Sequence, residues 1–122
     1  MKILKITDKF VDQRGLIANI FPQGAHIESI SYITGVVGAV RGNHYHRKKE
    51  HYCYVIEGSI KYGWINEHGE KQSIILEPGD IVYTPAKERH QVIFLTAGAL
   101  VEMGTEPREQ EHYAEDTICE AF

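Results

Sequence analysis

Several features that mark large classes of protein are scarce or missing in this sequence. Its 122 residues include only two cysteines, Cys53 and Cys119, which form no C-x-x-C motif. A disulfide framework is therefore not indicated, Cys53 is expected to be a small buried apolar residue, and a reducing cytoplasm is the simplest setting. No apolar run approaches the roughly 18 residues of a membrane span, and Lys5 and Asp8 interrupt the amino-terminal apolar stretch. We therefore expect neither a membrane span nor a signal peptide.

An excess of positive charge is also missing. Lysine and arginine total 13 against 17 aspartates and glutamates, for a formal net charge of −4. Generic nucleic-acid binding depends on a basic surface, so we expect no nucleic-acid partner. Hydrophobic residues make up 43% and charged residues 25% of the chain, which is typical of a globular protein rather than a disordered one. The length fits one domain spanning residues 1–122, large enough to bury its own core.

Convincing helical periodicity is missing as well. Ten short runs rich in Ile, Val and Tyr lie between residues 3 and 104, and Ala39–His46 is one of the longest. Turn-forming Gly, Pro and Asp separate them, as in DQRG at 12–15. Many short strands with regular turns predict an all-β sandwich or barrel. A short helix near Glu106–Ala114 is the weakest element, and the acidic tail is expected to pack on the outside or against a second subunit.

Histidine, by contrast, is abundant. Alternation along the strand Ala39–His46 places His44 and His46 on one face, about 7 Å apart, with Tyr45 on the other. The run HYCYVIEG begins at His51, and an antiparallel return of this strand would bring His51 close to the H-x-H pair. His90 opens a later strand, and four neutral imidazoles on one face would suit a divalent Zn, Fe, Mn, Ni or Cu ion. Three further histidines lie near turns or in the polar tail and are expected to be solvated: His26, His68 and His112.

Two segments resemble the two motifs of the cupin superfamily. GAVRGNHYHRKKEHYCYVIEG at 38–58 resembles the first motif, a glycine, an H-x-H pair and a closing glycine. The stretch 79–94, with Gly79, Pro85 and His90 at the expected spacing, resembles the second motif. The resemblance implies a single-domain cupin over residues 1–122, which is a double-stranded β-helix or jelly-roll barrel with the motif histidines as its site.

One position departs from the family pattern at the site itself. Six residues before the closing Gly58, where the family has a ligand glutamate, this chain has His51, and Glu50 is one residue out of register. Because a one-residue shift turns a side chain to the opposite face, His51 is expected to face inward as the fourth metal ligand, with Glu50 as its substitute if a bulge shifts the strand. The second motif departs at Lys87, where the family has glycine, and at Phe94, where it has asparagine. The competing interpretation is a metal-free pocket in which the same histidines act as acid and base.

A narrower resemblance is to the sugar-nucleotide branch of the cupins. The segments DQRG and VRGNHY are similar to the D-x-R-G and R-G-x-H segments of dTDP-4-keto-6-deoxyglucose 3,5-epimerases. That resemblance implies that Arg14 and Arg41 contact a nucleotide diphosphate and that His44 is a catalytic base. RGNHYHRKK is similar to a segment of dTDP-sugar 3,4-ketoisomerases in which both histidines, here His44 and His46, line the active site. RGNHYH also resembles the cupin half of capsule-biosynthesis reductases, which carries a metal.

Keto-sugar isomerisation needs a group that removes a proton beside a carbonyl and returns it elsewhere. A histidine with a pKa near neutrality suits both steps, and a metal or a tyrosine hydroxyl would stabilise the enolate oxygen. Tyr45 and Tyr83 are the candidate tyrosines for the site. Arginine forks grip phosphate oxygens, and Lys48 and Lys49, in the loop after His46, would add to this grip. The alternatives are a solvated turn for the two lysines and a surface turn charge for Arg14.

These observations predict an isomerase or epimerase that acts on a nucleotide-linked keto-sugar in cell-surface polysaccharide biosynthesis. Two other classes stay open, because fold alone does not choose among functions. They are a small metal-dependent cupin oxygenase with a four-histidine site and a non-catalytic sugar-binding or regulatory cupin. No organic cofactor is expected, the partner would be a small-molecule substrate, and a homodimer would cover some of the many sheet edges.

Overall fold

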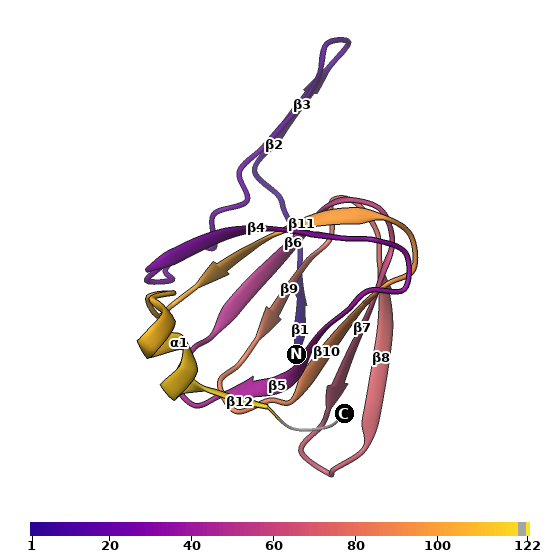
Figure 1. Cartoon of the computed structure of the whole chain (residues 1–122). Helices are drawn as coiled ribbons and strands as arrows, with labels where there is room; N and C mark the ends of the chain where they lie inside the picture. The colour runs from indigo at the N-terminus through magenta and orange to yellow at the C-terminus, as the bar shows by residue number, and fades with distance from the viewer. Residues whose placement is uncertain (120–121) are drawn as a thin grey trace.

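The computed structural model, which describes residues 1–119 and 122, is a jelly-roll sandwich of two five-stranded sheets (Figure 1). The first sheet has the order β1 (Lys2–Leu4), β9 (Ile81–Thr84), β6 (His51–Glu57), β11 (Gly98–Gly104) and β4 (Ser29–Gly35). The second has the order β12 (Thr117–Cys119), β5 (Val40–His46), β10 (His90–Phe94), β7 (Ile60–Ile65) and β8 (Lys71–Leu76). The predicted all-β architecture is confirmed, and β5 lies within the predicted strand Ala39–His46.

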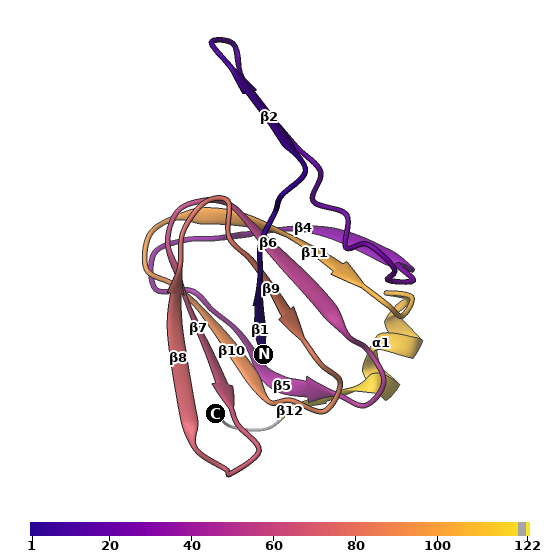
Figure 2. The same cartoon turned by 180° about the vertical axis from the view of Figure 1, so that it is seen from behind.

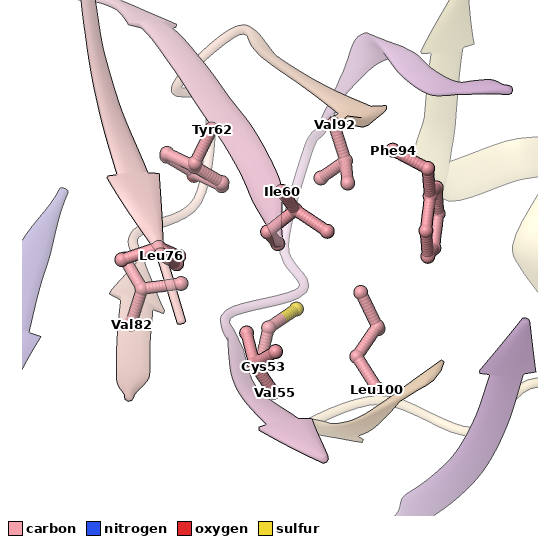
Figure 3. Close-up of a cluster of buried hydrophobic side chains, with 9 residues drawn as sticks. All are labelled: Cys53, Val55, Ile60, Tyr62, Leu76, Val82, Val92, Phe94 and Leu100. Atoms are coloured by element: carbon pink, nitrogen blue, oxygen red, sulfur yellow. The ribbon is translucent and has the colours of Figure 1, made fainter. Parts of the chain in front are cut away.

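The core lies between the sheets because each strand presents alternate side chains to the interior. In β6, His51, Cys53 and Val55 are buried, while Tyr52 and Tyr54 between them are half-buried on the outer face. Figure 3 shows the main apolar cluster, in which side chains from both sheets meet: Cys53, Val55, Ile60, Tyr62, Leu76, Val82, Val92, Phe94 and Leu100. The inner face of β6 therefore carries a histidine and a thiol directly beside the apolar cluster.

An amino-terminal hairpin projects away from the sandwich (Figures 1 and 2). Its strands, β2 (Lys9–Asp12) and β3 (Gly15–Ala18), form a two-stranded sheet of their own. The DQRG segment makes the turn at its tip. Four large apolar side chains of the hairpin are exposed: Phe10, Val11, Leu16 and Ile17. The predicted runs do not include β2, since KFVD is too short to show an alternating pattern.

The carboxyl-terminal segment packs on the sandwich. Helix α1 (Gln110–Asp116) lies beside the end of β5 in both views, and β12 then adds an edge to the second sheet by pairing with β5 (Figures 1 and 2). The helix was expected a few residues earlier; its amino-terminal cap makes no side-chain hydrogen bond, so no capping signal marks where it begins. Within residues 1–119 and 122, no helix is long and apolar enough to cross a lipid bilayer.

Gly58, which follows β6, adopts a conformation that a side chain would strain. Its φ is 83°, and a Cβ atom would lie 2.4 Å from the carbonyl oxygen of Ala97. Gly69 has a similar φ of 77° but open space around it. We expect Gly69→Ala to lower the free energy of unfolding by about 1–2 kcal/mol through backbone strain alone, and Gly58→Ala by more than about 3 kcal/mol because the backbone must also shift. Chemical denaturation measures both losses, and equal losses would contradict this packing.

Candidate active site between the two sheets

Four histidines converge inside the barrel. His44 and His46 come from β5, His90 from the start of the adjacent β10, and His51 from the start of β6 in the facing sheet. The ring centroids are separated by 4.6 Å for His44–His46, 4.7 Å for His44–His90, 4.8 Å for His51–His90 and 5.6 Å for His46–His51. His44 is half-buried and the other three are buried. The structure thus brings together the four histidines that the motif spacing singles out.

His51 reaches this cluster by a route that the sequence did not indicate. Strands β5 and β6 do not pair with each other, because they belong to different sheets, and His51 approaches His46 and His90 across the interior. The loop between the two strands crosses from sheet to sheet instead of closing a hairpin. Glu50, the expected substitute ligand, is turned to the outer face, where its carboxylate accepts a hydrogen bond from the Tyr83 hydroxyl. The inward position therefore belongs to His51, as the register argument requires.

Burial keeps these imidazoles uncharged. Desolvation between the sheets is the largest influence, and it lowers the pKa of His44 to about 4, of His46 to about 2 and of His51 to about 3. Burial also lowers the pKa of His90. From the sequence we expected a histidine with a pKa near neutrality, and this expectation was wrong because burial lowers the pKa values. At neutral pH each ring therefore offers one nitrogen lone pair and one N–H.

The donor set fits a divalent transition metal. Ligand nitrogens of His44, His46 and His90 lie within 4.8 Å of one another. Nε2 of His51 is buried and has no hydrogen-bond partner, and neutral imidazole nitrogens are what such ions bind. These four residues would hold Zn, Fe, Mn, Ni or Cu, and a bound ion would supply a Lewis acid for a substrate oxygen.

Three of the four histidines, His44, His51 and His90, line a cavity of about 290 Å³ between the sheets, and the His46 ring lies behind them. Its wall combines imidazoles with apolar side chains and with two guanidinium groups, those of Arg41 and Arg108. The Arg108 guanidinium carbon lies 4.6 Å from the ring centre of Tyr113, a tyrosine of α1 that also lines the cavity. A pocket of this size and mixed lining suits a small molecule, or one end of a larger one.

At the site, Glu102 was not found from the sequence, and Lys49 is neither a phosphate ligand in the cavity wall nor part of a solvated turn. Lys49 is buried and forms an ion pair with the carboxylate of Glu102 in β11, whereas Lys48, the predicted substrate-binding lysine, is exposed. Burial acts to raise the pKa of Glu102, but His51 and Lys49 lower it to about 2. The loop sequence RKKE does not reveal which lysine turns inward. Glu102 is brought to the site by the pairing of β11 with β6, in which it lies opposite Cys53, and this pairing could not be predicted from the sequence.

The carboxyl-terminal segment holds the loop that follows His46. The buried carboxylate of Asp116 accepts hydrogen bonds from the backbone N–H groups of Lys48 (2.7 Å) and Lys49 (3.3 Å). The hydroxyl oxygen of Thr117 lies 3.2 Å from Nδ1 of His46. The acidic tail therefore packs against the barrel beside the site, where it fixes the loop and the His46 ring.

Two residues next to the histidines have left-handed backbone conformations. Asn43 has φ 57° and Lys87 has φ 70°. Lys87 stands at the glycine position of the second motif, and its backbone N–H donates to the carbonyl of His46 at 2.7 Å. The side-chain oxygen of Asn43 accepts a hydrogen bond from Nε2 of Gln91 at 2.7 Å. Such conformations occur where the surroundings hold them in place, typically at functional sites.

Besides Lys48 and Glu50, three predicted site residues lie away from the cavity. Arg14 is at the tip of the hairpin, where its side chain is 81% exposed and bonded to Asp12. Tyr83 lies on the outer face of the first sheet with Glu50, and Tyr45 faces away from the H-x-H pair because it alternates with it along β5. Among the tyrosines of the described residues, Tyr113 is the one that lines the cavity. The sequence signal for it is weak, since it lies in the irregular tail.

A family model described as a cupin domain matches residues 32–103, which is more than half of the chain, and the chain belongs to the cupin family. Solved structures share its fold over nearly its whole length. A double mutant of the QdtA 3,4-ketoisomerase from Thermoanaerobacterium thermosaccharolyticum, in complex with TDP, is 24% identical, with a TM-score of 0.80 over 96% of this chain and 85% of that one.

Two further cupin enzymes show the same likeness in fold. A 3,4-ketoisomerase from Helicobacter canadensis is 22% identical, with a TM-score of 0.83 over 98% of this chain and 90% of that one. A dTDP-4-dehydrorhamnose 3,5-epimerase from Sulfolobus tokodaii is 18% identical, with a TM-score of 0.77 over 91% of this chain and 72% of that one. Among curated protein sequences, none matches this chain.

The lowered histidine pKa values predict an acid-sensitive fold. Burial holds the pKa of His46 below the usual histidine value of 6.5, so the unfolded chain binds more protons below neutrality and stability falls as the pH drops. In chelator-treated protein, we expect the melting temperature to decrease from about pH 7 to about pH 4, and to decrease less in His46→Gln.

The solvated histidines supply the control for this measurement. The side chains of His26 and His68 are 82% and 72% exposed, whereas the side chain of His112 lies outside the described residues. His68→Gln should follow the wild-type pH profile. A His46→Gln profile that is as steep as the wild-type one would contradict the burial argument.

Proposed function

We propose that this cupin is an isomerase or epimerase acting on a nucleotide-linked keto-sugar, in the synthesis of a cell-surface polysaccharide. The observation that carries the proposal is the set of neutral imidazoles from both sheets, three of which line a cavity together with Arg41 and Arg108. The 3,4-ketoisomerases and the 3,5-epimerase that share the fold support the same class of reaction.

The imidazoles suit the proton transfers of such a reaction. Moving a carbonyl or inverting a neighbouring carbon requires removal of a proton beside the carbonyl and its return at another position. His44 is the base in this proposal, because it lines the cavity and is only half-buried. Its pKa of about 4 is also higher than the values of about 2 for His46 and about 3 for His51. Negative charge that develops on the substrate oxygen would raise the pKa of the His44 imidazole toward the working pH. The neighbouring imidazole N–H groups would stabilise that oxygen.

The two arginines suit the diphosphate of the substrate. The guanidinium of Arg41 donates to the carbonyl of Thr34 from Nε (3.2 Å) and Nη2 (2.8 Å), which fixes its orientation at the cavity. Arg108 is held over the ring of Tyr113. Each guanidinium retains further N–H donors, and pairs of such donors match the oxygens of a phosphate.

Arg14 fits this function only if the protein is a homodimer. The family resemblance assigns this arginine to the diphosphate, yet it lies at the tip of a projecting hairpin and does not line the cavity of its own chain (Figure 1). The exposed Phe10, Val11, Leu16 and Ile17 give the hairpin an apolar surface that a second copy would cover. We therefore propose that the hairpin of one subunit brings Arg14 to the site of the other.

Proton transfer can be observed as solvent deuterium entering a dTDP- or UDP-linked keto-sugar. We expect exchange with chelator-treated wild-type protein and a loss of at least about 100-fold in His44→Asn, since the base is removed. His68→Asn, which changes an exposed histidine, is the matched control and should retain the wild-type rate. Absence of exchange over a broad panel of such sugars, with or without added metal, would overturn the proposed function.

Mixing of two variants tests the contribution of the second subunit. Arg14→Ala and His44→Asn should each have little activity alone, whereas a mixed dimer contains one site with both residues intact. We expect activity to return when the two variants are unfolded and refolded together. Failure of the refolded mixture to regain activity, or an unchanged affinity of Arg14→Ala for the nucleotide-sugar, would count against the exchanged hairpin.

A second candidate function, a metal-dependent oxygenase, is favoured by one observation. The imidazoles of His44, His46 and His90 offer three clustered ligand nitrogens, and the unpartnered Nε2 of His51 is a candidate for a fourth. The two functions separate in the exchange experiment. An oxygenase would need bound metal and molecular oxygen and would leave keto-sugar protons in place.

A further inference from the structure

His51 is the one histidine of the cluster with an unpartnered buried nitrogen among the described residues. Its side chain is 2% exposed, and Nε2 has no hydrogen-bond partner. The other ring nitrogen, Nδ1, lies 3.6 Å from Sγ of Cys53, two residues along the same face of β6. An unsatisfied buried polar atom is costly, so this nitrogen calls for a partner that enters the cavity.

The chemistry of the two side chains decides which nitrogen of His51 carries the proton. Burial raises the pKa of the Cys53 thiol well above its usual value, so the sulfur keeps its hydrogen. A thiol is a weak donor and a weak acceptor, whereas the lone pair of an imidazole nitrogen is a good acceptor. The contact is therefore best described as S–H donating to Nδ1. The proton of the neutral ring then resides on Nε2.

The position of the ring gives this N–H a direction. Nδ1 and Nε2 lie on different sides of the imidazole, so the contact with Cys53 leaves Nε2 free, and the neighbouring ring centroids are 4.8 Å away for His90 and 5.6 Å for His46. His51 and Cys53 both line the cavity. An N–H at this place can donate to an oxygen of a molecule bound there.

We infer that Cys53 is a positioning residue that holds His51 in the Nε2–H tautomer, so that His51 donates a hydrogen bond to the carbonyl or enolate oxygen of the substrate. This inference rests on the proposed function. The two sheets would then contribute different groups to the reaction. His44 of the second sheet accepts a proton, and His51 of the first sheet stabilises the negative charge that develops on the substrate oxygen. Cys53, expected from the sequence to be only a packing residue, acts through His51.

The alternative is that His51 and Cys53 serve a cation. Together with Glu102 they form a second group of potential ligands whose donor atoms lie within 4.8 Å of one another. The ion pair from Lys49 already neutralises the Glu102 carboxylate, and a buried thiol that keeps its proton is a poor ligand. The opposite tautomer, with Nδ1–H donating to sulfur, would instead free Nε2 to bind the metal of the four-histidine set. The tautomer thus separates the two interpretations.

Nitrogen-15 NMR of the histidine ring reads the tautomer directly, in chelator-treated protein without substrate. His51→Gln identifies the signal. We expect wild-type protein and Cys53→Ser, whose hydroxyl still donates, to show protonated Nε2. Cys53→Val, which fills the space without a donor, should lose this preference, and Cys53→Ala gives the same readout if the valine variant does not fold. An Nδ1–H tautomer in the wild type, or an unchanged tautomer in Cys53→Val or Cys53→Ala, would overturn the inference.

Kinetics then tests the consequence for the reaction. We expect kcat of Cys53→Val in the exchange reaction to fall about tenfold or more with little change in KM, since outright loss of a donor to a developing oxyanion costs about 100-fold or more. Cys53→Ser should restore most of the rate. Val55→Ala, an inward change on the same strand without a hydrogen bond to His51, is the control for packing and should retain the tautomer. Because the NMR measurement needs no substrate, failure of the tautomer and failure of the proposed function are distinguishable.

Discussion

The burial of four uncharged imidazoles between two facing sheets is the constraint on which the rest of this structure depends. Three of these histidines belong to β5 and β10 of one sheet, and His51 belongs to β6 of the other. None of the four could be charged at neutral pH without a large desolvation cost, which is why burial lowers the pKa of each ring. In their neutral form the imidazoles can accept a proton, donate an N–H hydrogen bond or bind a metal.

The surrounding structure holds those neutral rings in place. Asp116 binds the loop after His46 through two backbone N–H groups, and Lys87 supports the same strand end from a left-handed conformation. On the other sheet the Cys53 thiol contacts His51. These contacts come from the tail, from a turn and from β6 itself. They hold the histidines in place, while Arg41 and Arg108 line the cavity beside them.

The parts of this site that could be predicted are those that depend on local periodicity. The two-residue repeat of a strand places His44 with His46 and excludes Glu50 in favour of His51, and motif spacing adds His90. The path of His51 could not be predicted, because it depends on which sheet each strand joins. The burial of Lys49 could not be predicted for a similar reason, since its partner Glu102 lies 53 residues away in the sequence. Strand β2 of the projecting hairpin was missed because its four residues are too few to show an alternating pattern.

The central claim is that the sugar end of a nucleotide-linked substrate is held among these four imidazoles. The most direct test is a crystal structure of the protein with a dTDP-linked keto-sugar or a non-reactive analogue. We expect the sugar ring in the cavity, with an oxygen within hydrogen-bond distance of Nε2 of His51 and the diphosphate against Arg41. A ligand bound on the outer face of either sheet, with the histidine cluster untouched, would contradict it.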